Sequence, residues 1–175
     1  IYGMVENIDW NVGRVMELLK ELGLEENTLV VFLSDNGPNG QRFNASMKGV
    51  KGSVHEGGVR VPSFWRWKGK INPQLISTPA AHIDVMPTLV ELFGLESKGE
   101  KPWDGISLAS VFEGGELESR PIFSHVAGLE KELKSRPGAV RKDSLLLTLL
   151  PDGVGLYDLK NDPDQLQNLA EVQPD

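Results

Sequence analysis

The spacing of apolar residues predicts a helix at the start of the chain. Between Tyr2 and Leu22, apolar side chains recur at steps of three and four residues, as one face of an amphipathic helix requires. Gly23 follows, at the position where a glycine commonly ends a helix. The next apolar run, Thr28–Leu33, is rich in β-branched residues and apolar on both faces, which is typical of a central strand in a parallel sheet. This order of helix, short loop and strand predicts an αβ unit of a doubly wound sheet.

Three further elements are predicted in the same part of the chain. Gly58–Trp67 has the pattern of a strand. Thr78–Phe93 has the periodicity of a helix, which we expect to begin near Asp84 with Pro87 in its first turn, where proline is tolerated. Ile106–Phe112 predicts a short helical turn.

The pattern changes after residue 115, where short apolar runs alternate with turns. Such alternation predicts a small antiparallel sheet. Its predicted strands are Pro121–His125, Ala139–Arg141, Leu145–Leu150 and Gly155–Leu159. The polar tail, Leu159–Asp175, is predicted to end in a short helix. We therefore divide the chain into an α/β part, residues 1–115, and a small antiparallel subdomain, residues 116–175.

Composition narrows the classes of partner. Hydrophobic residues make up 39% of the 175 residues and charged residues 25%, which allows a packed core. The formal net charge of -7 argues against a protein that binds the nucleic-acid backbone, which would present a basic surface. The apolar runs are far shorter than the roughly 20 residues that a membrane-spanning helix needs, so we expect neither nucleic acid nor a membrane as a partner. The chain has no cysteine, which excludes thiolate metal sites.

A long polar loop, residues 34–60, carries the candidate chemistry. Its sequence, SDNGPNGQRFNASMKGVKGSVHEGGVR, directly follows a predicted strand, and long loops tend to be functional or disordered. In a doubly wound sheet, ligands bind beyond the carboxyl ends of the strands. Asp35 and Asn36 lie at such an end and offer the oxygen ligands that Ca²⁺ or Mg²⁺ prefers, while Gly37 permits a sharp turn. An ordinary β-turn is the alternative, and the local sequence alone favours it.

The charged side chains further along the loop are ambiguous when taken singly. Lys51, between glycine-rich neighbours, could bind an anion or lie on a solvated basic loop. His55 and Glu56 could act in acid–base chemistry or bind a metal, although a structural pair is the simpler interpretation. Arg60 is predicted within a strand, as a buried charge paired with Glu56 or Asp35. The sequence contains no Ser-His-Asp grouping, HExxH or paired-Cys motif.

Taken in order, five stretches resemble the sulfatases of the alkaline-phosphatase-like superfamily. They are TLVVFLSDNG (28–37), KGSVHEGGVRVP (51–62), HIDVMPTLVELFG (82–94), DGISL (104–108) and LYDLKNDPDQLQNLA (156–170). The combination of the first two is highly specific, and the sequence looks like arylsulfatases and N-acetylgalactosamine-6-sulfatase-like enzymes. The resemblance implies part of the superfamily's α/β fold, with a doubly wound sheet followed by a small C-terminal antiparallel sheet and a helix.

The resemblance also implies roles for residues of the loop. Asp35 and Asn36 match two ligands of a catalytic divalent cation, usually Ca²⁺, and Lys51 matches a lysine that contacts the sulfate group. A doubly charged metal and an ammonium group would stabilise charge on the sulfuryl oxygens as the S–O bond breaks. Neighbouring residues would shape the loop and support these groups: Gly37, His55, Glu56, Gly57, Gly58 and Arg60.

The sequence also departs from the family pattern. Sulfatases use a formylglycine made from the Cys or Ser of a C/S-x-P-x-R motif, and the stretch at Ser77 has the proline in the right place but Ala81 where Arg is required. The acidic pair that completes the metal site, and the family's catalytic histidine and lysine, are also missing. We therefore expect the chain to be the C-terminal portion of a longer sulfatase, with formylglycine in an N-terminal part, and to be inactive by itself.

Three functions are compatible with these observations. The first is a sulfuric ester hydrolase, whose substrate would be a sulfated small molecule or glycan. A related phosphodiesterase or phosphonate hydrolase shares the logic of the metal site, and a non-catalytic module that binds an anion or carbohydrate would need no nucleophile. Because a buried strand expects neighbours on both sides, we also expect an exposed apolar sheet surface and dimerisation of this chain. The family suggests a periplasmic or extracellular location.

Overall fold

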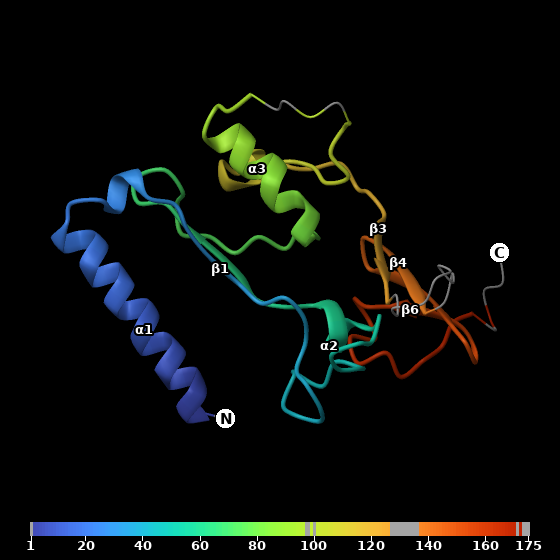
Figure 1. Cartoon of the computed structure of the whole chain (residues 1–175). Helices are drawn as coiled ribbons and strands as arrows, with labels where there is room; N and C mark the ends of the chain where they lie inside the picture. The colour runs from blue at the N-terminus through green and yellow to red at the C-terminus, as the bar shows by residue number, and fades with distance from the viewer. Residues whose placement is uncertain (1, 97–98, 100, 127–136, 171, 173–175) are drawn as a thin grey trace.

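The computed structural model describes residues 2–96, 99, 101–126, 137–170 and 172. Figure 1 shows a long first helix, a central ribbon of two strands below a group of short helices, and a separate sheet near the end of the chain. Within the described residues, no helix is long and apolar enough to span a bilayer.

The first helix, α1 (Tyr2–Glu21), matches its prediction, but its apolar stripe is uncovered. None of its residues is buried, and Val15 and Leu18 are each 53% exposed. A short 3-10 turn, η1 (Glu25–Asn27), connects α1 to the first strand, and Figure 1 shows α1 lying apart from that strand. Because an amphipathic helix gains most of its stability by burying its apolar face, this stripe is available for further contacts.

The central ribbon corrects two predictions. β1 (Val30–Leu33) pairs antiparallel with β2 (Ser63–Arg66), so no parallel or doubly wound sheet forms among the described residues. An apolar pattern on both faces of a strand does not fix the direction of the neighbouring strand, and no residue of β1 is buried in this structure. The strand predicted for Gly58–Trp67 begins later than expected, because Glu56–Val59 forms one helical turn, α2.

The second predicted helix is confirmed. η2 (His82–Asp84) leads into α3 (Val85–Leu92), with Pro87 in the first turn of α3. Asp84 is fully buried, and its carboxylate accepts two backbone amides, at 2.7 and 3.0 Å, and pairs with Arg120. These contacts fix the start of the helix, since a buried carboxylate is stable only when it is hydrogen-bonded and paired.

The predicted helical turn before residue 115 is also confirmed, as α4 (Ala109–Phe112). Val111 and Phe112 form a buried apolar cluster with Leu108, and Trp65 of β2 packs against it. The rings of Trp65 and Phe112 lie 5.4 Å apart. This cluster attaches the short helices to the central ribbon.

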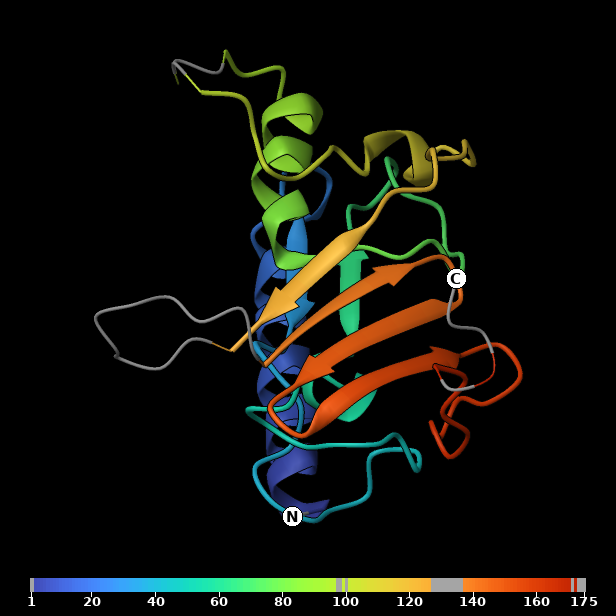
Figure 2. The ribbon, with the colours of Figure 1, turned by 90° about the vertical axis from the view of Figure 1, so that its right-hand side faces the viewer.

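The predicted antiparallel sheet is confirmed, with four strands in the order β3–β4–β5–β6 (Figure 2). The strands are β3 (Ile122–His125), β4 (Gly138–Lys142), β5 (Leu145–Leu150) and β6 (Gly153–Asp158). Val54 of the long loop is 1% exposed and packs with Ala139 and Leu146 of this sheet. Residues 159–170 contain turns and no helix, and the end of the tail, where the short helix is predicted, lies mostly outside the described residues.

Candidate metal and anion site

The long loop between β1 and β2 folds back on itself. The backbone amide of Gly37 donates to the carbonyl oxygen of Gly58 at 2.9 Å. The amide of Lys51 donates to the carbonyl oxygen of Pro38 at 3.0 Å. These bonds tie the segment that directly follows β1 to the segment around Lys51, so two groups of candidate residues share one framework.

Close backbone approach explains the glycines at the base of this loop. A Cβ atom added to Gly37 would lie 1.9 Å from the carbonyl oxygen of Gly57. A Cβ at Gly57 would lie 2.3 Å from the carbonyl oxygen of Gly49, and one at Gly58 would lie 2.2 Å from that of Ser53. Real Cβ atoms essentially never approach other atoms this closely, so a larger residue would displace the backbone. The geometry supports the loop-shaping role expected of these glycines.

Asp35 and Asn36 lie directly after β1. Asp35 is exposed, and Asn36 is half-buried with its side-chain nitrogen donating to the carbonyl oxygen of Gly37 at 3.0 Å. The Nε2 atom of His82 lies 2.8 Å from the carbonyl oxygen of Ser34, which ties η2 to this strand end. A carboxylate and an amide oxygen fit Ca²⁺, which takes about 6–8 oxygen ligands. Among the described residues, no group of three or more His, Cys, Asp or Glu could hold a metal, so this pair by itself could supply only part of a coordination sphere.

Lys51 occupies the second position of a tight turn. The amide of Ser53 donates to the carbonyl oxygen of Val50 at 2.9 Å. Gly52 has a φ of 84°, as the third position of a type II turn requires. The Lys51 side chain is exposed at this turn, where it is accessible to an anion.

The neighbouring Lys48 has a different environment. Its ammonium group donates to the hydroxyl of Tyr157 at 3.1 Å and lies 4.9 Å from the centre of the Tyr157 ring, a cation–π geometry. It also lies 3.5 Å from the carbonyl oxygen of Gln165. Because Lys48 is engaged with the C-terminal part of the chain, Lys51 is the better candidate for the anion ligand.

The environment of His55 favours a structural role. This residue is 6% exposed, and its Nδ1 lies 2.9 Å from the side-chain nitrogen of Gln165. That nitrogen can only donate, so Nδ1 is the acceptor of an imidazole that is unprotonated there. Burial lowers the pKa of His55, and the Lys48 ammonium lowers it further, against an opposing effect of Asp152. A buried, neutral imidazole of this kind supports the structural interpretation over a metal ligand or an acid.

Glu56 is buried as well, at 2% exposure. Both of its carboxylate oxygens accept from Nη1 of Arg141 on β4, at 2.9 and 3.0 Å. Arg60 pairs with Glu56 at 3.5 Å, as predicted, but its side chain is 62% exposed and follows α2, so the prediction of a buried charge within a strand is wrong. No local sequence pattern predicts Arg141 or Gln165 as partners of the loop, because these partners are far away in the sequence. Arg141 lies 85 residues after Glu56, and Gln165 lies 110 residues after His55.

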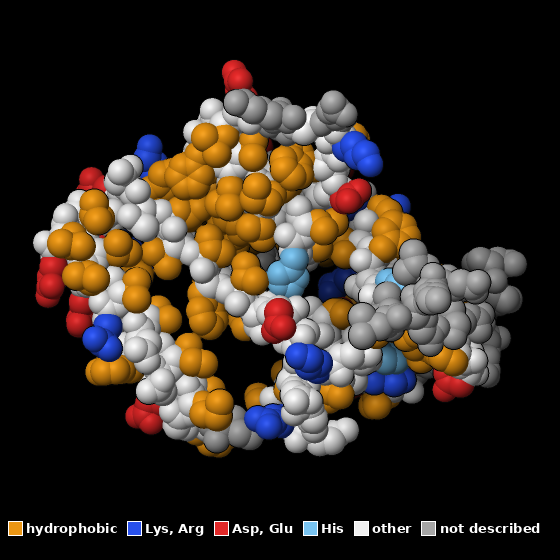
Figure 3. Space-filling model, viewed as in Figure 1, with side chains coloured by type: hydrophobic (Ala, Val, Ile, Leu, Met, Phe, Trp, Pro, Cys, Tyr) orange, Lys and Arg blue, Asp and Glu red, His pale blue; other side chains and the backbone are white. Residues whose placement is uncertain are grey.

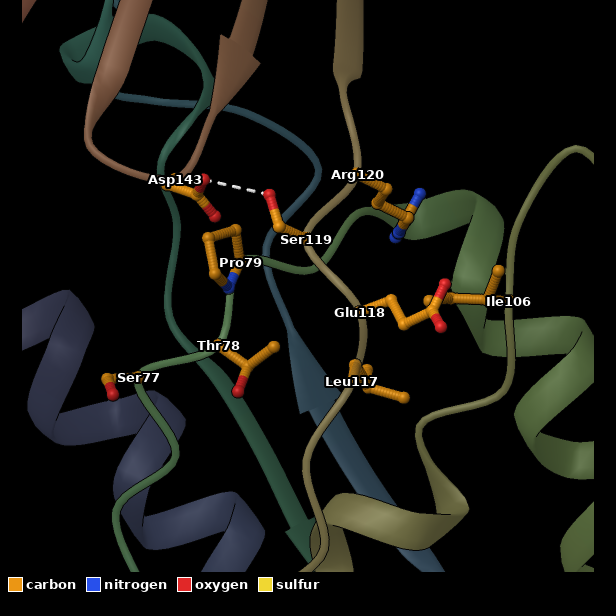
Figure 4. Close-up of a pocket in the computed structure, with 9 residues that line it drawn as sticks. All are labelled: Ser77, Thr78, Pro79, Ile106, Leu117, Glu118, Ser119, Arg120 and Asp143. Atoms are coloured by element: carbon orange, nitrogen blue, oxygen red, sulfur yellow. Dashed lines mark hydrogen bonds between the residues drawn. The ribbon is translucent and has the colours of Figure 1, made fainter.

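A concavity with a volume of about 210 Å³ lies away from this loop (Figure 4). It is lined by Ser77, Thr78, Pro79, Ile106, Leu117, Glu118, Ser119, Arg120 and Asp143. The hydroxyl of Ser119 donates to Asp143 at 2.8 Å. No residue of the loop 34–60 lines this cavity, so Ser77 does not share it with the candidate metal pair.

The loop therefore holds two candidate oxygen ligands and an accessible lysine on one backbone framework, within part of an α/β fold. Comparison with known proteins identifies the family: the Sulfatase family matches residues 1–95, more than half of the chain. The chain belongs to the Sulfatase family. The steryl-sulfatase of Mus musculus is 40% identical over an alignment of 130 residues that covers 68% of this chain and 21% of that protein.

Solved structures extend the similarity to nearly the whole chain. The crystal structure of Ps i-CgsB in complex with k-i-k-neocarrahexaose matches with a TM-score of 0.82 at 27% identity, over 97% of this chain and 38% of that one. The phosphonate monoester hydrolase of Agrobacterium radiobacter matches with a TM-score of 0.71 at 25% identity, over 97% and 36%. The chain thus spans between 21% and 38% of the lengths of these three proteins.

Proposed function

We propose that this chain supplies part of the active site of a sulfuric ester hydrolase. Asp35 and Asn36 are two ligands of a divalent cation, Ca²⁺, and Lys51 binds the sulfate group. One observation carries the proposal: in a chain of the Sulfatase family, backbone hydrogen bonds tie the segment after β1 to the segment around Lys51. The other six residues of the candidate set lie around these groups, and three of them are glycines that close packing requires.

The proposed chemistry follows from charge. Cleavage of a sulfate ester builds negative charge on the sulfuryl and leaving oxygens, which positive groups held nearby stabilise. Asp35 provides negative charge for binding the cation, and Asn36 adds a neutral oxygen. Lys51 presents a compact charge on a flexible stem and donates to a sulfate oxygen. Bound Ca²⁺ would supply Lewis acidity at the same oxygens.

The nucleophile is not among these residues. The sequence contains no C/S-x-P-x-R motif, and the pair at positions 35 and 36 cannot complete a calcium site. We infer that formylglycine and the remaining metal ligands come from other residues of the intact enzyme, and that the 175-residue chain alone does not hydrolyse sulfate esters. The coding sequence upstream of Ile1 is the first thing to read. A C/S-x-P-x-R motif after an Asp-Asp pair would support this proposal, whereas a start codon at Ile1 would favour a non-catalytic binding module.

Hydrolysis of 4-nitrophenyl sulfate tests the role of the loop. In the polypeptide that carries formylglycine, Lys51→Ala should lower kcat/KM by about 100-fold or more, because it removes a charge from the transition-state site. Lys160→Ala, at an exposed lysine in the tail, is the matched control and should leave kcat/KM unchanged. A wild-type kcat/KM in Lys51→Ala would refute the assignment of Lys51. Hydrolysis above a buffer control by the 175-residue chain would refute its predicted inactivity.

Phosphoryl transfer is the second candidate function. The similarity to a phosphonate monoester hydrolase favours it, since that protein has the same fold over nearly all of this chain. Comparing kcat/KM for 4-nitrophenyl sulfate with that for 4-nitrophenyl phenylphosphonate separates the two. We expect the sulfate to be preferred, and a preference for the phosphonate would reverse our assignment.

For the substrate, we propose a sulfated glycan or a sulfated small molecule. The complex of Ps i-CgsB with k-i-k-neocarrahexaose supports this class, because that protein matches 97% of the present chain. Release of inorganic sulfate from a panel of sulfated oligosaccharides and aryl sulfates is the direct measurement. No release from any member of the panel would contradict the proposed class.

We also propose that the isolated chain dimerises through its uncovered apolar surface. Phe32 and Phe64 lie side by side on the central ribbon, with ring centres 6.2 Å apart, and are 38% and 63% exposed. Figure 3 shows further apolar side chains gathered over α3, and the apolar stripe of α1 is uncovered as well, with Val15 and Leu18 each 53% exposed. Apolar surfaces of this kind commonly mark sites of protein association.

A further inference from the structure

We propose that Gln165 and Arg141 position the loop that carries Lys51. Gln165 contacts the buried residues His55 and Glu56 at the base of that loop, Arg141 contacts Glu56, and we call these contacts the clamp. Gln165 and Arg141 would act through the loop rather than on the sulfate, so they are positioning residues. The effect on catalysis rests on the proposed function, whereas the effect on the loop does not.

Gln165 uses both ends of its side-chain amide in the clamp. It is 1% exposed, its Oε1 accepts the backbone amide of Glu56 at 3.1 Å, and its Nε2 lies 2.9 Å from Nδ1 of His55. Its backbone φ is 54°, a left-handed conformation that non-glycine residues adopt rarely. Such a conformation persists only where the surroundings fix it, and here the side-chain partners belong to the loop.

Arg141 fixes the same base from β4. Its Nη1 donates to both carboxylate oxygens of Glu56, and its Nε donates to the carbonyl oxygen of Asp143 at 3.2 Å, which orients the guanidinium group. The Glu56 side chain is 3% exposed. Without Arg141, this carboxylate would have only the exposed Arg60 as a cationic partner among the described residues, at 3.5 Å.

Backbone contacts connect the clamp to both candidate ligand groups. The carbonyl oxygen of Gly58 accepts the amide of Gly37, the residue directly after the proposed metal pair. The amide of Gly57 donates to the carbonyl oxygen of Lys48 at 2.8 Å, three residues before Lys51. These contacts join backbone to backbone, so no flexible side chain absorbs a shift of the base. A misplacement of about 1 Å at a reacting group can lower a rate about 100-fold.

The hydrogen-bond roles around His55 provide an independent readout. The oxygen of Gln165 accepts a backbone amide, so its nitrogen donates to Nδ1 of His55, which must be unprotonated. The other groups that face the imidazole are the Lys48 ammonium, the Asp152 carboxylate and the Tyr157 ring, at 5.8 Å between ring centres. Protonation of Nδ1 would place its N–H donor opposite the Nε2–H donor of Gln165, and the loss of this hydrogen bond would weaken the clamp.

Amide hydrogen exchange in the 175-residue chain tests the clamp. Gln165→Met keeps a similar volume but removes both hydrogen bonds, and Gln167→Ala is an exposed control of the same residue type. We expect Gln165→Met to speed exchange in residues 48–58 by about ten-fold or more, with a smaller change in β4–β6. Gln167→Ala should match the wild type in both regions. Unchanged exchange in residues 48–58 would overturn the proposal, as would an equal increase in the loop and the sheet, since that would indicate a role in overall stability only.

Two further variants keep the test decisive if Gln165→Met does not fold. Arg141→Lys retains the charge but loses the planar donor geometry, and it should speed exchange in the same loop residues by a smaller factor. Gln165→Glu retains an acceptor for the amide of Glu56 but cannot donate to His55. Its carboxylate would accept from a protonated Nδ1, so the His55 titration followed by NMR should move to higher pH than in the wild type. An unchanged titration would overturn the assigned contact.

The catalytic consequence needs one more measurement. In the polypeptide that hydrolyses 4-nitrophenyl sulfate, Gln165→Met should lower kcat about 10- to 100-fold, while Gln167→Ala has no effect. Wild-type kcat in a Gln165→Met enzyme whose loop exchanges faster would overturn the link between the clamp and the site. Absence of sulfatase activity in the wild type would refute the proposed function instead, and the exchange comparison would still decide the clamp.

Discussion

Replacing Gly37 by alanine should destabilise the loop through a single added atom. The new Cβ would lie 1.9 Å from the carbonyl oxygen of Gly57, whereas contacts under 3.0 Å essentially do not occur. The two backbone segments would have to separate by about 1 Å, which would break the 2.9 Å hydrogen bond between Gly37 and Gly58. Overpacking costs about 1–3 kcal/mol and the lost hydrogen bond about 1 kcal/mol, so the expected total is about 2–4 kcal/mol.

Thermal unfolding followed by circular dichroism measures this effect. For a chain of this size, each kcal/mol shifts Tm by about 2–4 °C, so Gly37→Ala should melt about 4–16 °C below the wild type. Gly13→Ala is the control, because nothing lies within 4 Å of the added Cβ and alanine favours a helix. It should leave Tm unchanged or raise it. A Tm for Gly37→Ala within about 2 °C of the wild type would refute the close-packing explanation of the loop glycines.

Three further predictions concern the loop base and the first helix. Because burial lowers the pKa of His55 in the folded chain, the stability contributed by the neutral imidazole is complete above the ordinary pKa of 6.5 and is lost as pH falls through the folded pKa. The midpoint of urea unfolding should therefore be lower at pH 5 than at pH 7, and this decrease should be smaller in His55→Gln than in the wild type. Equal decreases in the two proteins would contradict this prediction. Arg141→Ala should lower the free energy of unfolding by about 3–5 kcal/mol, because it leaves the Glu56 carboxylate buried without its main partner. Adding Glu56→Gln to this variant removes the unpaired charge and should restore part of the lost free energy. No recovery in urea unfolding of the double variant would argue against a charge effect. Light scattering should show dimers of the wild type that dissociate on dilution, and replacing Val15 and Leu18 of α1 by glutamate should weaken them; a wild-type monomer at all concentrations would exclude the proposed association.

The elements that local sequence predicts are those with local causes. α1 and α3 follow from apolar spacing, and the position of Pro87 marks the first turn of α3. The C-terminal strands follow from short apolar runs separated by turns, and all four are present. In each case, residues within a few positions of one another determine the backbone conformation.

The features that the sequence does not predict depend on distant partners. β1 is apolar on both faces, but its antiparallel partner β2 lies beyond a long loop, and no pattern in β1 specifies that direction. The α2 turn replaces the start of a predicted strand, at glycines that pack against the backbone of residues 48–53 and of Gly37, which follows β1. For the candidate site, the motif places Asp35, Asn36 and Lys51 on one loop, whereas the contacts of Arg141 and Gln165 emerge only from the fold.

The burial of Val54 determines which pieces of this chain could be exchanged with a relative. Val54 belongs to the loop of the α/β part, yet it packs in the apolar core of the C-terminal sheet with Ala139 and Leu146. A chimera that replaced only residues 116–175 would present a foreign core to this side chain and leave a gap or a clash, either of which destabilises. A graft that takes the loop and the sheet together would preserve the fit, so the transplantable unit is discontinuous in sequence.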